Sequence, residues 1–316
     1  MSNGHNHSHA HGHGHSHGHA HAPPKNFNKA FAIGIVLNLG FVIIEAAYGF
    51  VANSLALIAD AGHNLSDVIG LVLAWGAVWL STRKPSQKYT YGLRRSSILS
   101  ALLNAVLLLV AVGGITWEAV RRFWQPAQIE TGTVMVVAFI GIIINGLTAV
   151  LFASGRKEDL NIRGAYLHMA ADALVSLGVV IAAFIIQQTN WLWMDPSISI
   201  AISVIITIGT WGLLRDSVSL AMDGVPTGVN IQNVRDYFTR SEGVLELHDL
   251  HIWAMSTTET ALTVHLVMAP HTGTDSFLAK VCGDLKTKFK IDHPTIQIES
   301  GDLASFEGAL KPDEVV

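Results

Sequence analysis

The sequence predicts an α-helical membrane protein with six transmembrane helices, followed by a small cytoplasmic α+β domain with a ferredoxin-like fold. Half of the 316 residues are hydrophobic and only 14% are charged. The mean hydropathy of +0.40 is higher than one ordinary soluble domain of this size needs. Six long apolar segments fill the first two thirds of the chain, and the last third has mixed polarity.

Residues 1–24 are predicted to be a disordered, histidine-rich cytoplasmic tail. Small or polar residues separate the histidines, so no hydrophobic core can form there. The imidazoles could capture metal weakly; the alternatives are a dispensable tail or an engineered tag. The N-terminus lacks the pattern of a secretory signal, so the first span is expected to direct insertion. The alternating histidines are His5, His7, His9, His11, His13, His15, His17, His19 and His21.

Residues 25–222 are predicted to form the membrane domain. A spanning helix needs roughly 20 mostly apolar residues, and six such stretches occur, at 30–51, 55–80, 98–117, 133–153, 165–186 and 197–214. An even number places both termini on one side. The positive-inside rule makes that side cytoplasmic, because only Arg121 and Arg122 lie at the opposite ends. The basic residues on the predicted cytoplasmic side are Lys25, Lys29, Arg83, Lys84, Lys88, Arg94, Arg95, Arg156, Lys157 and Arg163.

Residues 223–305 are predicted to form the small α+β domain, and residues 306–316 a C-terminal tail. The pattern indicates a helix at 231–239, strands at 244–253 and 261–268, a helix at 276–289 and a strand at 295–299. An αββαβ order suggests a ferredoxin-like layer of helices on a sheet.

Histidine and aspartate occur together inside two of the apolar spans. Each such group costs at least about 2.5 to 3.5 kcal/mol at bilayer depth on insertion scales, so a function is expected. The second span contains His63 and Asp67, and the fifth contains His168 and Asp172. Both pairs read His-x-x-x-Asp, and this spacing places imidazole and carboxylate on one helix face.

Two such faces turned toward each other would supply two nitrogen and two oxygen ligands. That set suits tetrahedral Zn²⁺, and the lone Cys282 excludes a cysteine-rich site. Interhelical hydrogen bonding is the structural alternative, which the recurrence of the spacing disfavours. Asp60, three residues before His63, could support a ligand or contact a helix. Because ligands must be deprotonated, metal binding at this site would expel protons and permit proton–metal exchange.

A second candidate cluster comprises His248, His265 and Glu299 on the predicted strands. The alternative to a metal site is that these histidines lie on the surface of the sheet and bind no metal. His248 and His251 are an odd number of residues apart, so we expect them on opposite faces of their strand. The net charge of −4, with no basic stripe, gives no support to a nucleic-acid partner.

The segments "SLALIADAGHNLSD", "HMAADAL" and "HDLHIWAM" resemble the cation diffusion facilitator family, most closely its bacterial CzcD/ZitB branch. The resemblance implies a homodimeric, proton-coupled exporter in the bacterial inner membrane, with a ferredoxin-like cytoplasmic domain. It also implies that the two His-x-x-x-Asp pairs form the transport site. Histidine at the first position of the second-span motif implies a preference for Zn²⁺ over Cd²⁺, and CzcD-like proteins also handle Co²⁺ and Cd²⁺.

Three features of this chain either depart from the family pattern or match it. The loop "RKPSQKYTYGLRRS" has no Asp or His, so we predict no metal site there. Gln297 stands where some relatives have histidine, which implies a weakened, single-ion or absent regulatory site. An interlocking pair at the dimer junction would fall on Arg95 and Asp223.

Two other classes of function compete with an exporter. A non-transporting membrane metal sensor would also use the histidine tail and the soluble domain. An intramembrane metalloenzyme is disfavoured because no His-Glu-x-x-His run occurs. The expected partners are therefore divalent metal ions, protons, lipid and a second copy of the chain, with Zn²⁺ as substrate and no organic cofactor.

The two His-x-x-x-Asp pairs differ in their expected depth in the membrane. Arg163 lies about one helical turn from His168, which places the fifth-span pair nearer the cytoplasmic edge than the second-span pair.

Overall fold

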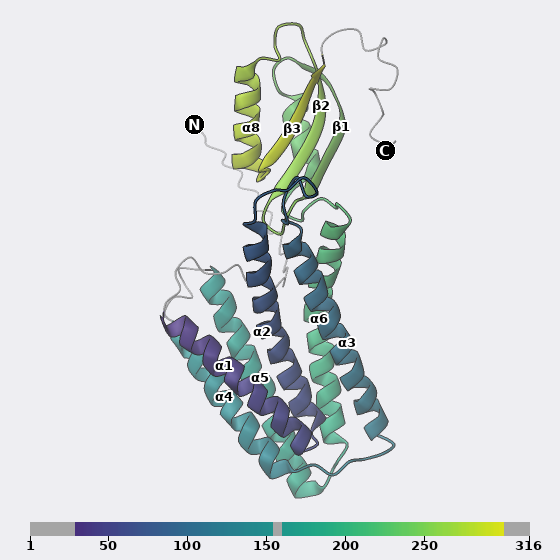
Figure 1. Cartoon of the computed structure of the whole chain (residues 1–316). Coiled ribbons are helices and arrows are strands. Elements are labelled where there is room, and N and C mark those ends of the chain that lie inside the picture. Colours follow the sequence, from purple (N-terminus) through teal and green to yellow (C-terminus); the bar gives the residue numbers. More distant parts are fainter. Residues whose placement is uncertain (1–28, 154–159, 300–316) are drawn as a thin grey trace, which may run out of the picture.

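The computed structural model describes the backbone of residues 29–153 and 160–299, and side chains from residue 39 onward except 71, 74, 75, 78 and 151–165. The predicted tails, 1–24 and 306–316, lie outside this part of the chain, as do Arg156 and Lys157. Six long helices come first, with a small sheet domain at one end of the bundle (Figure 1). The helices are α1 (Lys29–Val51), α2 (Leu55–Ser81), α3 (Ser96–Arg122), α4 (Thr131–Ala153), α5 (Leu160–Thr189) and α6 (Met194–Ala221).

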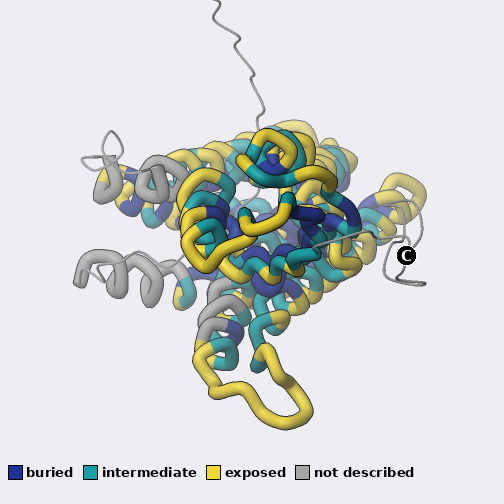
Figure 2. The backbone as a smooth tube through the Cα atoms, turned by 90° about the horizontal axis from the view of Figure 1, so that it is seen from above, coloured by how far each residue is buried: buried dark blue, intermediate teal, exposed yellow. Residues whose placement is uncertain are grey.

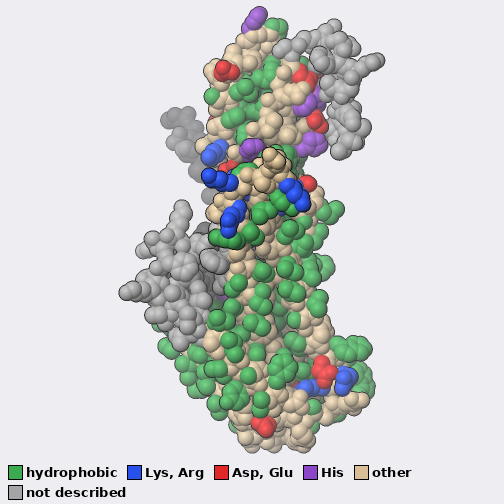
Figure 3. Space-filling view, in the orientation of Figure 1, with side chains coloured by type: hydrophobic (Ala, Val, Ile, Leu, Met, Phe, Trp, Pro, Cys, Tyr) green, Lys and Arg blue, Asp and Glu red, His purple; other side chains and the backbone are tan. Residues whose placement is uncertain are grey.

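Apolar side chains cover the outside of the helical bundle. Phe50, Trp117 and Ile208 are each more than 70% exposed, and hydrophobic side chains dominate the flank visible in Figure 3. Such a surface needs lipid around it, because water would be an unfavourable neighbour. Within the described residues, four helices are long and apolar enough to cross a membrane, namely Ser96–Arg122, Thr131–Val150, Tyr166–Thr189 and Met194–Ala221. The chain is therefore a helical membrane protein.

The helices pack in pairs around a common interior. α4 packs against α5 and α3 against α6, while α2 contacts α3, α5 and α6. Buried residues lie toward the middle of the molecule when it is seen from above (Figure 2). The core includes Phe41, Leu57, Val112, Val179 and Ile202, one from each of five helices. α2 is thus central to the bundle.

Gly141 allows α1, α4 and α5 to approach closely. A Cβ atom at this position would lie 2.8 Å from the Phe41 ring and 3.3 Å from Ser176 Oγ. Backbone approach at such distances favours glycine, as in other packed transmembrane helices. The side chains of α5 next to Ser176 are therefore held against α1 and α4.

The C-terminal domain has the predicted αββαβ order. β1 pairs antiparallel with β2, and β2 pairs parallel with β3, giving a three-stranded sheet in the order β1-β2-β3. This is one strand fewer than the βαββαβ ferredoxin-like arrangement. The elements are α7 (Ile231–Thr239), β1 (Val244–Ala254), β2 (Thr260–Met268), α8 (Asp275–Phe289) and β3 (His293–Glu299).

Side-chain caps and one polar contact hold the two helices of this domain. The Asn230 side chain accepts hydrogen bonds from two backbone amides at the start of α7, as expected of a helix cap. Tyr237 Oη donates to Asp284 Oδ2 at 2.8 Å, and Lys288 Nζ lies 2.9 Å from Asp284 Oδ1. The hydrogen bond from Lys288 lowers the pKa of Asp284, helped by that from Tyr237. Burial, with the contact to Asp284, raises the pKa of Tyr237.

The C-terminal domain sits on the loop between α2 and α3. Arg94 forms an ion pair with Glu259, and the backbone amide of Thr257 donates to Ser97 Oγ at 3.1 Å. Lys and Arg side chains gather at this junction (Figure 3). The basic loop and the C-terminal domain therefore occupy the same end of the helical bundle.

Candidate metal site

One face of α2 carries polar residues on successive turns. Asp60, His63 and Asp67 follow one another at spacings of three and four residues, which places them along one stripe of the helix. The stripe faces α5, which carries His168, Asp172 and Ser176 at spacings of four. Both helices are otherwise mostly apolar. Polar side chains are costly in contact with lipid, so those of the two helices face each other inside the bundle.

Three contacts join the two stripes. His168 Nε2 lies 2.9 Å from Asp67 Oδ2, and His63 Nε2 lies 3.5 Å from Asp172 Oδ1. One turn farther along, Ser176 Oγ donates to Asp60 Oδ2 at 2.8 Å. The contacts run in opposite directions along the two sequences, as they must for antiparallel helices. The histidine of each pair therefore meets the aspartate of the other pair.

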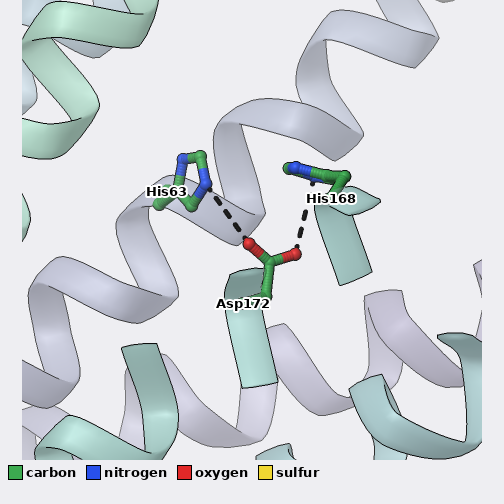
Figure 4. Close-up of side chains that lie close together, drawn as sticks. All are labelled: His63, His168 and Asp172. Carbon is green, nitrogen blue, oxygen red and sulfur yellow. Dashed lines mark ion pairs between the residues drawn. The ribbon is translucent and has the colours of Figure 1, made fainter. Parts of the chain in front are cut away.

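Asp172 lies between the two imidazoles. Its carboxylate oxygens are 3.5 Å from His63 Nε2 and 3.6 Å from His168 Nε2 (Figure 4). The fourth predicted residue, Asp67, lies 4.0 Å from His63 Nε2 in addition to its contact with His168. The structure thus brings together the four residues expected from sequence. Ligand atoms of His63, His168 and Asp172 all lie within 4.8 Å of one another, which suits a single ion.

The four side chains of the site differ in exposure. The side chain of Asp172 is 2% exposed and that of His168 is 10% exposed, whereas those of His63 and Asp67 are 24% and 32% exposed. Asp172 is therefore the most buried of the four side chains and Asp67 the most exposed. His63 Nδ1 and Asp172 Oδ2 are buried without a hydrogen-bond partner, so the protein leaves donor and acceptor capacity unused here.

The sequence predicts that the His-x-x-x-Asp pair of α5 lies nearer the cytoplasmic edge of the membrane than the pair of α2, yet the two pairs meet in the structure. The sequence places His168 close to the predicted cytoplasmic edge, and its partner in the structure is Asp67, the α2 ligand farthest from the start of α2. The deeper residues, His63 and Asp172, likewise meet each other. Antiparallel packing therefore matches the two pairs level by level.

Buried polar residues beside this site escape sequence reasoning. Asn64 Nδ2 donates to Glu45 Oε2 on α1 at 3.2 Å, and both side chains are buried. A lone acidic residue in an otherwise apolar helix was the available signal for Glu45. Asp60, expected from sequence to support a ligand or contact a helix, accepts a hydrogen bond from Ser176.

A second unexpected network holds the first turn of α2 at the opposite end of the bundle. Asp195, in the first turn of α6, accepts hydrogen bonds from Ser54 Oγ at 2.6 Å, Leu55 N at 2.9 Å and Ala56 N at 3.2 Å. Arg122 Nη1 lies 3.5 Å from the same carboxylate. The carboxylate satisfies backbone donors that the start of a helix leaves free. This network sets where α2 begins.

The C-terminal cluster also assembles. His265 Nδ1 lies 2.8 Å from Glu299 Oε1, and His248 Nε2 lies 3.2 Å from Glu299 Oε2. The three ligand atoms lie within 4.8 Å of one another, as a metal site would require. Gln297 lies beside this group, and its side-chain amide donates to Glu299 Oε1 at 3.1 Å.

The expectation that His248 and His251 face opposite ways is wrong. An irregularity in β1 between these residues shifts its register against β2, so His248 lies opposite His265 and His251 opposite Thr263. Asp249 in this bulge has φ of 54°. The extra residue restores the same face to both histidines. His251 Nε2 then lies 2.8 Å from Asp249 Oδ1.

The predicted junction residues are in contact within one chain. Arg95 Nη2 forms an ion pair with Asp223 Oδ1, and both side chains are about half exposed. Asp223 follows α6 with a positive φ of 60°. The contact therefore ties the start of α3 to the segment that leads from α6 into the C-terminal domain.

Two family models match most of the chain. A family model described as "Cation efflux transmembrane domain" matches residues 31–221, and one described as "Cation efflux protein, cytoplasmic domain" matches residues 226–301.

Three bacterial relatives are similar over most of their length. The "Cadmium, cobalt and zinc/H(+)-K(+) antiporter" of Bacillus subtilis (strain 168) is 36% identical over 277 residues, covering 86% of this chain and 89% of the relative. The "Metal cation efflux system protein CzcD" of Cupriavidus metallidurans is 38% identical, covering 87% and 88%. The "Zinc transporter ZitB" of Escherichia coli (strain K12) is 36% identical, covering 85% and 86%. The chain therefore belongs to the cation diffusion facilitator family of cation efflux transporters.

Proposed function

We propose that this chain exports Zn²⁺ from the cytoplasm in exchange for protons, by alternating access at a site formed by His63, Asp67, His168 and Asp172. Co²⁺ and Cd²⁺ are proposed as further substrates, because the names of the relatives from Bacillus subtilis and Escherichia coli include zinc, and that of the former also cadmium and cobalt. The chain acts as a secondary transporter and has no catalytic site in this proposal.

The meeting of two His-x-x-x-Asp pairs inside the bundle carries the proposal. Contacts of 2.9 to 4.0 Å link two imidazoles and two carboxylates that belong to helices far apart in sequence. Two nitrogen and two oxygen donors match the tetrahedral preference of Zn²⁺. Without a cation, the buried carboxylate of Asp172 has the two imidazoles beside it to offset its charge.

The same donor set supports proton coupling. An imidazole must be neutral and a carboxylate ionised before either can bind a metal ion, so an arriving cation displaces the protons that the site carries. When the site opens to the other side, protons can rebind as the metal leaves. An inward proton gradient would then drive metal outward, consistent with the antiporter activity named for the Bacillus subtilis relative.

The proposed topology has six spans in the bacterial inner membrane, with both termini in the cytoplasm. Support comes from the basic loop between α2 and α3, which lies at the end that carries the C-terminal domain. Arg121 and Arg122 lie at the opposite end, where Arg122 is engaged by Asp195. This asymmetry follows the positive-inside rule.

The C-terminal domain is proposed to be a ferredoxin-like layer that lacks one strand and to mediate homodimer formation. His248, His265 and Glu299 are proposed as a secondary cytoplasmic metal site, supported by their convergence on one face of the sheet. Arg95 and Asp223 are proposed to stabilise the region where two subunits would meet. The relatives give no support to a non-transporting sensor, because each is named for transport or efflux.

Zinc flux into vesicles tests the proposed function. The purified chain is reconstituted into liposomes, a pH gradient is imposed, and Zn²⁺ uptake is followed with a trapped fluorescent indicator. We expect uptake that collapses when the gradient is dissipated. Asp172→Asn should abolish it, whereas Asp275→Asn, the same change at an exposed position of α8, should leave it intact. Absence of flux in the parent would refute transport, and unchanged flux in Asp172→Asn would refute the site.

A further inference from the structure

A buried amide side chain on α4 has no role in the proposed ligand set. Asn145 is 0% exposed, and both its Oδ1 and its Nδ2 are buried without a hydrogen-bond partner. An amide offers two N–H donors and one acceptor oxygen, and burying such a group without partners destabilises a fold. A polar group kept in this state calls for an explanation, and ion binding is one.

The packing of α4 against α5 gives the level of Asn145 in the bundle. A Cβ atom on Gly141 would lie 3.3 Å from Ser176 Oγ, so these two positions face each other. α5 follows α4 after a short connection, and neighbouring helices joined in this way run antiparallel. One turn forward on α4 therefore corresponds to one turn back on α5, which brings Asn145 to the level of Asp172. Side chains four residues apart share a helix face, so Asn145 lies on the side of α4 that faces α5.

The transport site has unused polar atoms at the same level. His63 Nε2 lies 3.5 Å from Asp172 Oδ1, while His63 Nδ1 and Asp172 Oδ2 are buried without a hydrogen-bond partner. α4 contains no titratable side chain, and the nearby Thr148 donates to Ile144 O of its own helix at 2.7 Å. Asn145 is therefore the polar group that α4 has available at this level.

We propose that Asn145 Oδ1 acts as a fifth ligand for Co²⁺ and Cd²⁺ at the transport site, and so determines which divalent ions the protein exports. This inference rests on the proposed function. Zn²⁺ is satisfied by four nitrogen and oxygen ligands, which the two His-x-x-x-Asp pairs supply. Co²⁺ and Cd²⁺ accept five or six ligands more readily, and selection among such ions depends on the type and geometry of the ligands.

A neutral ligand has effects that differ from those of the four charged or titrating ones. The amide carries no exchangeable charge, so its loss should leave the number of protons exchanged per Zn²⁺ unchanged. Leucine has a similar size and lacks the oxygen. Asn145→Leu should raise the KM for Co²⁺ about tenfold and change that for Zn²⁺ by less than about twofold, since loss of a residue that supports a metal site typically costs at least the former factor in affinity.

Uptake of Zn²⁺ and of Co²⁺ into liposomes tests this inference. The full chain and Asn145→Leu are reconstituted, a pH gradient is imposed, and the concentration dependence of each uptake is measured. Asn233→Leu, the same change at an exposed position of α7, should match the parent for both ions. Asn145→Asp, which keeps an oxygen at this position, should retain Co²⁺ uptake.

The outcomes separate this inference from the proposed function. Equal changes in the two KM values of Asn145→Leu, or no change in either, would overturn the role of Asn145. Loss of Co²⁺ uptake by Asn145→Asp, with Zn²⁺ uptake intact, would also contradict an oxygen ligand. A parent that transports Zn²⁺ but not Co²⁺ would overturn this inference alone, whereas a parent that transports neither ion would overturn the proposed function as well.

The visible absorption of bound Co²⁺ provides a second test, which decides even if Asn145→Leu does not fold. Four-coordinate Co²⁺ absorbs visible light much more strongly than five-coordinate Co²⁺. The spectrum of the matching Asp172→Asn chain is subtracted from each spectrum, which removes the signal of ions bound elsewhere on the chain. We expect a weak five-coordinate spectrum from the parent and a strong four-coordinate spectrum from Asn145→Leu. A strong four-coordinate spectrum from the parent would overturn the proposal.

Discussion

Removing the Asp195 carboxylate should destabilise the protein and weaken its metal site. Asp195 is 2% exposed, and its carboxylate accepts from Ser54 Oγ, Leu55 N and Ala56 N and is paired with Arg122. Asp195→Ala leaves three donors and a mostly buried guanidinium without this partner. Breaking a buried pair in this way costs about 3 to 5 kcal/mol in unfolding free energy.

The conservative substitution Asp195→Asn should lower the unfolding free energy less than Asp195→Ala does. Asparagine is as good a helix-capping residue as aspartate, so Asp195→Asn can keep one acceptor oxygen near the start of α2. It loses the charge that faces Arg122 and the helix dipole, which we expect to cost about 1.5 to 3 kcal/mol. Arg122 keeps its hydrogen bonds to Asn53 O and Oδ1, each at 2.6 Å, which limits the loss.

The effect should extend to metal binding through the position of α2. A shift of α2 by one residue moves its side chains by about 1.5 Å along the axis and turns them by about 100°. His63 and Asp67 would then miss Asp172 and His168. Asp195→Ala should therefore lower Zn²⁺ affinity although it lies away from the ligands.

The assay is equilibrium unfolding in mixed micelles, with Zn²⁺ affinity measured by calorimetry on the same preparations. Asp275→Ala, at an exposed position, is the matched control and should change stability by no more than about 0.5 kcal/mol. A double-mutant cycle with Arg122→Met isolates the ion pair. A loss below about 1 kcal/mol for Asp195→Ala would refute the role assigned to this carboxylate.

Three further predictions concern the C-terminal domain and its junction with the helical bundle. Arg95→Ala and Asp223→Ala should couple by no more than about 1 kcal/mol in dimer stability measured by sedimentation, because the pair is exposed, and strict additivity would exclude the proposed junction role. Glu299→Gln should weaken Zn²⁺ binding by the full chain at the secondary site in calorimetry while flux persists, and an unchanged second binding event would contradict that site. Because the pKa of Asp284 is lowered in the folded state, its contact with Lys288 should stabilise the protein above the unfolded pKa and lose that effect as pH falls through the folded pKa. Asp284→Asn should flatten this acid-side decline in unfolding measurements, and an unchanged pH dependence would argue against it.

Much of the local structure follows from residue patterns. Helix α7 has the predicted bounds, and the three strands lie within a few residues of prediction, because alternation and capping residues are local signals. The four proposed ligands were found from a repeated spacing of an imidazole and a carboxylate. Spacing alone identifies which residues share a helix face, since side chains four apart lie one turn apart.

Other features depend on contacts between distant segments. The β1 bulge at Asp249 reversed an inference based on strict alternation, because a single extra residue changes the face of everything beyond it. Glu45 accepts a hydrogen bond from Asn64 only because α1 packs against α2. Asp195, at the start of α6, meets the first turn of α2 only because the two helices pack together.

The residue pattern thus determined the helices, their polar stripes and the four residues proposed to hold the metal. Tertiary structure decided which members of the stripes meet: His168 with Asp67, His63 with Asp172, and Asp60 with Ser176. The physical reason is that helical periodicity sets direction around one axis, whereas the relative height of two helices depends on packing and end contacts along their whole length. Two pairs that differ in apparent depth along the sequence can therefore form one site.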